Sequence, residues 1–136
     1  MKTKNRFESM QTKLELCGKY GCLFLCILSI AEEVSEKEID LQHAILICQS
    51  KGWLSYDFTV KDSLAILNYY TNKTWHRLEL TKLPSVIKDN EFTVVKYYNS
   101  KTKYTHFKRR SFDTLVDSQT VKFGFIQEYY IYNYEV

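Results

Sequence analysis

The sequence predicts an α+β fold in which N-terminal helices pack on a C-terminal antiparallel sheet. Apolar residues recur at helical spacing before residue 72, whereas apolar and polar residues alternate after residue 74. Eleven tyrosines and eight phenylalanines lie mostly after residue 50, and these residue types favour half-buried strands. Helices followed by antiparallel strands are typical of the α+β class.

The length of 136 residues is typical of one domain, and we expect a single domain over residues 1–136. Its helical part would cover about residues 5–72 and its sheet part about residues 74–135. Only one proline and four glycines interrupt the chain, which indicates regular structure with short connections.

Helical periodicity is found in four stretches of the first half. They are a short helix or arm at 5–16, an apolar helix at 22–34, a helix from 35 to 52 and a helix that begins near 62. Ser35 and Glu38 have the spacing of a capping box and would open the third of these. Asp62 or Ser63 would cap the fourth. Residues 53–60 are expected to form a loop or a short strand.

Strand periodicity defines the second half. The predicted strands are 75–80, 91–98, 103–108, 110–116 and 120–134, the last bent at Gly124. A hairpin centred on Arg109 and Arg110 would place His106 directly opposite Asp113. Opposed residues share a face with Cβ atoms ~4.5–5.5 Å apart, so the carboxylate could hold the imidazole.

Composition argues against several classes of function. A net charge of +3 with 26% charged residues is too mild for a dedicated nucleic-acid binder. The ten-residue apolar run 22–31 is shorter than the ~20 residues that a bilayer requires, and it is poorly placed for a signal peptide. We therefore expect a cytoplasmic protein that does not bind membranes. Its four cysteines would then be reduced.

Cys22 has the features of a nucleophile, because it follows a glycine and opens the apolar helix at 22–34. Backbone N–H groups at a helix N-terminus favour a thiolate. A thiol enzyme also needs a base, a group that orients the base, and donors for the oxyanion. His106 and Asp113 are candidates for the first two roles. The backbone N–H of Cys22 and the side-chain amide of Gln11 are candidates for the third.

The order of a cysteine on an early helix, then a histidine and an acid on later strands, is the arrangement of papain-like peptidases. Four segments point the same way: YGCLFLCILSIAEE (20–33), GWLSYDFTVKD (52–62), THF (105–107) and FDTLVDSQTVKFGFI (112–126). In this order they resemble an uncharacterised family, domain of unknown function 261, found in phage and bacterial plasmid genes. The resemblance implies a distant papain-like fold with Cys22, His106 and Asp113 at the candidate catalytic positions. Thr114 departs from the family pattern, in which proline follows the aspartate.

Cys17 is the alternative nucleophile. Gln11 and Cys17 have the Q-x5-C spacing, followed by Gly18, of papain and of the bacteriocin-processing peptidases. A helix that began at Cys17 would carry Gly18 and Gly21 in its first turns, each costing ~1 kcal/mol relative to alanine. We therefore favour Cys22.

The remaining cysteines and histidines have simpler interpretations. Cys26 and Cys48 are expected in the core, His43 on the surface, and His76 in a structural role. Cys17 and Cys22 lack the second ligand pair of a structural zinc site, so neither a metal nor another cofactor is expected.

Two functional hypotheses follow from the sequence. The first is a papain-like cysteine peptidase, or a related thiol hydrolase, that acts on a peptide or amide bond. The alternative is a non-catalytic protein-binding domain with the same fold, which would form a homodimer if its aromatic tail strand lay at a sheet edge. A nucleic-acid interaction through the basic residues is the weakest hypothesis; they are Lys101, Lys103, Lys108, Arg109 and Arg110.

Overall fold

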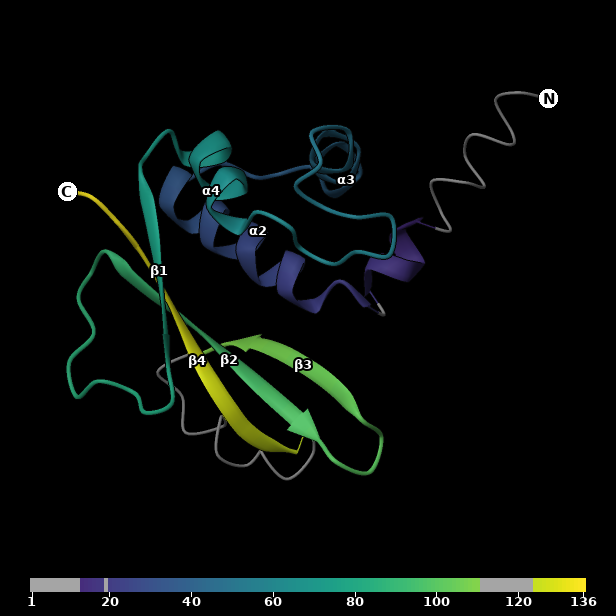
Figure 1. Cartoon of the computed structure of the whole chain (residues 1–136). Coiled ribbons are helices and arrows are strands. Elements are labelled where there is room, and N and C mark those ends of the chain that lie inside the picture. The colour runs from purple at the N-terminus through teal and green to yellow at the C-terminus, as the bar shows by residue number, and fades with distance from the viewer. Residues whose placement is uncertain (1–12, 19, 111–123) are drawn as a thin grey trace. The chain divides into compact units, whose positions relative to one another are not determined.

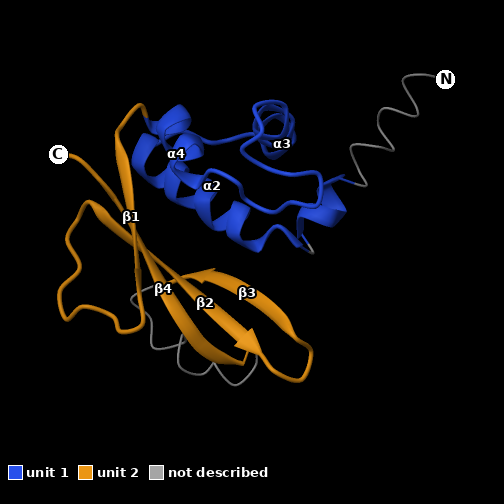
Figure 2. Cartoon of the chain, viewed as in Figure 1, with its two compact units in different colours: residues 1–71 blue, residues 72–136 orange. Residues whose placement is uncertain are grey.

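The computed structural model describes residues 13–18, 20–110 and 124–136 (Figure 1). The chain divides into two compact units, residues 1–71 and residues 72–136 (Figure 2). The first unit is helical and the second is a sheet. The boundary lies where the sequence predicts a change from helical to strand periodicity, and the described residues confirm the α+β class.

Helix α2 (Cys22–Ser35) begins at the predicted residue and packs against α4 (Ser63–Thr71). It ends because Glu36 adopts a left-handed conformation with φ of 57°, and the Glu36 N–H donates to the Glu32 carbonyl oxygen. Its buried side chains recur at helical spacing; they include Phe24, Ile27, Ile30 and Ala31.

Helix α3 (Leu41–Ser50) begins later than the predicted capping box. Its N-cap is Asp40, whose Oδ1 accepts a hydrogen bond from the His43 N–H at 3.0 Å. The capping box at Ser35 was a wrong prediction because α2 continues through Ser35. An N-cap residue must leave the helical conformation, and Ser35 does not. Its hydroxyl oxygen accepts from the Lys37 N–H instead.

The cap predicted for the last helix is confirmed at Asp62. Its Oδ1 accepts a hydrogen bond from the Ala65 N–H at 3.0 Å, at the start of α4. The connection from α3 to α4 contains an isolated antiparallel bridge between Leu54 and Val60. The prediction of a loop or short strand between these helices is therefore confirmed.

The described part of the second unit contains a four-stranded antiparallel sheet (Figure 1). Its strands are β1 (Trp75–Leu80), β2 (Glu91–Asn99), β3 (Tyr104–Arg109) and β4 (Phe125–Tyr134). Their order is β1-β4-β2-β3, and each neighbouring pair is antiparallel. β1 has the predicted bounds, β2 ends one residue later than predicted, β3 is shifted by one residue, and β4 ends at the predicted residue. The predicted strand 110–116 is not confirmed, because Arg110 is not in a strand and residues 111–116 lie outside the described residues.

The aromatic tail strand β4 lies inside the sheet, paired with β1 on one side and β2 on the other. Tyr132 and Ile131 of this strand are fully buried. The homodimer was expected only if this strand lay at a sheet edge. β4 is not an edge strand, so that condition is not met. Gly124 precedes β4 with φ of +106°, and a Cβ there would lie 2.2 Å from the Tyr98 carbonyl oxygen. Residues 120–123 of the predicted strand lie outside the described residues.

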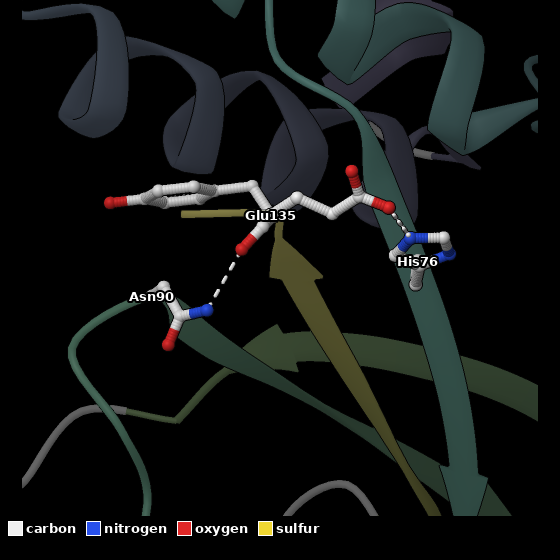
Figure 3. A network of polar contacts seen from close by, with 4 residues as sticks. His76, Asn90 and Glu135 are labelled. Carbon is white, nitrogen blue, oxygen red and sulfur yellow. Dashed lines mark hydrogen bonds and ion pairs between the residues drawn. The ribbon is translucent and has the colours of Figure 1, made fainter.

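A network of polar contacts holds the end of β4 (Figure 3). Asn90 Nδ2 donates to the Tyr134 carbonyl oxygen at 2.8 Å, and the Glu135 N–H donates to the Thr74 carbonyl oxygen at 3.0 Å. His76 Nε2 lies 2.8 Å from Glu135 Oε1. The side chains of His76 and Glu135 are 57% and 64% exposed, so this ion pair contributes only ~0–1 kcal/mol. These contacts agree with the structural role predicted for His76.

Candidate functional site

Cys22 is the first residue of α2, and the preceding Gly21 caps the helix without a side-chain hydrogen bond. The Cys22 side chain is half-buried, and no acidic side chain lies in the first turn. The N–H groups at a helix N-terminus carry partial positive charge, which favours a thiolate over a thiol. The local geometry is therefore compatible with the nucleophilic role predicted for Cys22.

Cys17 lies in the helical residues 13–18 and not at the start of a helix. Its side chain is fully buried, and burial raises the pKa of this thiol to about 11. At neutral pH such a thiol is almost entirely protonated, and the protonated form is a poor nucleophile. The structure therefore favours Cys22 over Cys17 as the reactive thiol.

His106 lies in β3, opposite Tyr97 of β2, and its side chain is half-buried. Its pKa is lowered from the ordinary value, chiefly by burial and further by the positive charge of Lys108. The imidazole is therefore mostly neutral at pH 7. A neutral imidazole is the form that can accept a proton as a general base.

The backbone near Arg109 differs from the predicted hairpin. Arg109 belongs to β3 and pairs with Val94, and the Arg110 N–H donates to the Thr93 carbonyl oxygen at 3.0 Å. The chain is thus still paired with β2 where a turn was predicted. The turn at Arg109 and Arg110 was therefore a wrong prediction, because pairing with β2 satisfies the backbone groups of this segment.

The full constellation stays a prediction. Asp113 and Gln11 lie outside the described residues, so their roles as orienting acid and oxyanion donor are untested. Cys22 belongs to the helical unit and His106 to the sheet unit. The contact between the Cys22 thiol and the His106 ring is therefore also a prediction.

The other cysteines and histidines agree with their predicted environments. Cys26 and Cys48 are buried, and burial raises the pKa of Cys48 to about 11. His43 is exposed on α3. Within residues 13–18, 20–110 and 124–136, no group of three or more His, Cys, Asp or Glu side chains could hold a metal ion.

The helical unit contains an open groove with a volume of about 660 Å³. The described residues that line it are Leu16, Tyr20, Tyr56, Asp57, Phe58 and Thr59. Cys22 is not among them. Sequence analysis missed this site because residues 53–60 were interpreted only as a connection. The available signal was a carboxylate placed directly between two aromatic residues, Tyr56 and Phe58.

Hydrogen bonds fix the loop that carries Asp57. The Ser55 N–H donates to the Thr59 carbonyl oxygen at 3.0 Å, and the Thr59 N–H donates to Asp57 Oδ1 at 3.2 Å. The Ser55 hydroxyl also donates to Asp57 Oδ1. Hydrogen bonds from Ser55 first, and from Thr59 next, lower the pKa of the Asp57 carboxyl group. Asp57 is therefore negatively charged at neutral pH.

No family model, curated protein or solved structure matches this chain. The papain-like core and the resemblance to domain of unknown function 261 therefore stay predictions. In the described part of the chain, no helix has the length and apolar character needed to cross a bilayer.

Proposed function

We propose that this protein is a papain-like cysteine hydrolase that cleaves a peptide or amide bond. The observation that carries the proposal is the position of Cys22, a half-buried thiol at the first residue of an apolar helix with no acid in its first turn. Burial and Lys108 lower the pKa of His106, so the free imidazole is neutral and can accept the thiol proton. Once the proton has moved, the negative charge of the Cys22 thiolate would stabilise the imidazolium, because an opposite charge nearby favours the charged form. The order of the two residues along the chain, and the family resemblance, add to this support.

In the proposed reaction, Cys22 Sγ attacks the substrate carbonyl carbon and its proton passes to His106. The backbone N–H of Cys22 and the Gln11 amide donate to the oxyanion. The C–N bond then breaks, His106 returns the proton to the leaving amine, and a thioester remains. Water attacks this thioester with His106 as base, which releases the carboxylic acid and restores the thiol. Asp113 orients the imidazole throughout.

The pH dependence of Cys22 alkylation tests this proposal. A thiolate paired with an imidazolium reacts with iodoacetamide at a nearly constant rate from about pH 5 to pH 8. The rate of an isolated thiol instead rises towards its ordinary pKa of about 8.5. We expect the constant rate in the unmodified chain and the rising rate in His106→Gln, each followed by mass spectrometry of the Cys22 peptide.

The matched control is His76→Gln, which removes a histidine from the same sheet but should leave the constant rate unchanged. If the alkylation rate rises in the same way in the unmodified chain and in His106→Gln, the two side chains do not form a catalytic pair. The proposal would then be abandoned.

A non-catalytic protein-binding domain is the second candidate. It is favoured by the groove of the helical unit, because Cys22 does not line this concave surface. For a binding domain, Cys22 would react as an isolated thiol with or without His106. The alkylation profile therefore separates the two candidate functions.

A further inference from the structure

The groove of the helical unit presents unusually exposed aromatic side chains. Tyr56 is 81% exposed and Tyr20 is 51% exposed, and Leu16 beside them is 38% exposed. Phe58, in contrast, is 2% exposed and anchors the loop in the core. Large side chains that are exposed together around a concavity are typical of binding surfaces. The volume of about 660 Å³ is also in the usual range of ligand sites, roughly 300–1,000 Å³.

One carboxylate gives the groove its charge. Asp57 Oδ1 accepts hydrogen bonds from Ser55 and Thr59, which hold the side chain in one orientation. A carboxylate has about four acceptor positions, so this group can accept further hydrogen bonds from a ligand. Among the described residues, no lysine or arginine forms an ion pair with Asp57. The carboxylate is thus complementary to a positive group that the described chain does not itself supply.

We propose that this groove binds the lysine or arginine side chain of a partner peptide. The ammonium or guanidinium group would donate to Asp57 and lie against the phenol rings of Tyr20 and Tyr56. The alkyl stem of the same side chain would pack against Leu16. The inference holds whether or not Cys22 is catalytic, since Cys22 does not line the groove.

Three acetylated and amidated tripeptides test the preference for a cation: leucine-lysine-leucine, leucine-arginine-leucine and leucine-norleucine-leucine. Norleucine keeps an alkyl stem and removes the charge. Dissociation constants are measured with the full chain by isothermal titration calorimetry. We expect the lysine and arginine peptides to bind at least tenfold more tightly than the norleucine peptide. Equal affinities, or no binding of any peptide, would overturn the proposal.

Substitutions then assign the binding to the groove. Asp57→Asn keeps an Oδ1 atom that can accept from Ser55 and Thr59, but removes the charge. We expect this variant to bind the lysine peptide about tenfold more weakly and the norleucine peptide unchanged. Tyr56→Ala, at an 81% exposed position, should weaken binding of both peptides without changing the thermal melting temperature.

Asp89→Asn is the matched control, because it removes the same charge from an exposed position in the sheet unit. It should bind all three peptides as the unmodified chain does. If Asp57→Asn and Asp89→Asn behave alike, the carboxylate of the groove does not recognise the cation, and the proposal is wrong.

Discussion

At the scale of single residues, Gly21 determines where the helix that carries Cys22 begins. The Gly21 N–H donates to the Cys17 carbonyl oxygen at 2.8 Å. A Cβ at this position would lie 2.6 Å from that same oxygen and 3.0 Å from Cys17 Sγ. Glycine therefore permits a close approach between the end of one helical segment and the start of the next.

This close approach predicts the effect of adding a methyl group. Gly21→Ala should destabilise the protein by ~1–3 kcal/mol, because the Cys17 carbonyl is backbone and can move away only if the helices shift. The free energy of unfolding is measured by urea denaturation. Gly18→Ala is the control, since a Cβ there meets no atom within 4 Å. It should leave stability unchanged or raise it by up to ~1 kcal/mol. Equal losses in both variants would contradict this explanation.

At the scale of elements, the start of α3 depends on Asp40 and not on Ser35. The Asp40 carboxylate accepts from the His43 N–H, which otherwise has no acceptor within the helix. The Ser35 hydroxyl makes only a local and exposed contact with the Lys37 N–H at 3.3 Å. Of these two side chains, only the Asp40 carboxylate provides an acceptor for a backbone N–H in the first turn of a helix.

Alanine substitutions distinguish these two roles. Asp40→Ala should lower the free energy of unfolding by ~0.5–2 kcal/mol, the usual cost of losing an N-cap. Ser35→Ala should change it by less than ~0.5 kcal/mol, as for most surface substitutions. Urea denaturation of both variants provides the measurement. If Ser35→Ala lost more unfolding free energy than Asp40→Ala, the assignment of Asp40 as the N-cap of α3 would be wrong.

Basic side chains of the sheet lie over its aromatic rings. The Arg77 guanidinium is 5.1 Å from the centre of the Tyr130 ring, and the Arg109 guanidinium is 5.7 Å from that of Phe92. The second contact involves one of the basic residues of the nucleic-acid hypothesis. The guanidinium groups of Arg77 and Arg109 pack against aromatic rings of the sheet. A nucleic-acid partner is therefore not needed to explain why these two arginines are present.

At the scale of the whole molecule, one half-buried imidazole and two buried thiols predict how stability depends on pH. The pKa of His106 is lowered in the folded chain, so the unfolded chain binds a proton more readily. The contribution of the neutral His106 ring to the free energy of unfolding is complete above the unfolded pKa of about 6.5. It is lost as the pH falls below that value. Burial raises the pKa of Cys17 and Cys48 to about 11, so the unfolded chain loses their protons first. The contribution of these two thiols to the free energy of unfolding therefore declines as the pH rises above about 9.

The expected result is a maximum of stability between about pH 6.5 and pH 9. His106→Gln should reduce the fall on the acid side, and Cys48→Ala should reduce the fall on the alkaline side. Unfolding free energies are compared at several pH values up to about 9.5. Above that value Tyr70 also contributes, because burial raises its pKa to about 12 in the folded chain, whereas an unfolded tyrosine titrates near about pH 10. Parallel curves for the unmodified chain and both variants would show that these groups do not control the pH dependence.

The sequence by itself determined the positions of most elements. The helix that starts at Cys22, the cap at Asp62 and the strand ends of β1 and β2 follow from local periodicity and local hydrogen bonding. The same local features identified Cys22 as the candidate nucleophile. Such features depend on residues within a few positions of each other, and a single sequence contains them directly.

Only the tertiary structure decided which strands are neighbours and which groups are buried. An alternating pattern indicates that β4 is a strand, but it does not say that β4 lies between β1 and β2. The pKa of Cys17 and the groove around Asp57 likewise depend on side chains far away in the sequence. Burial and strand pairing are set by distant segments that come together on folding, whereas periodicity is set by neighbours along the chain.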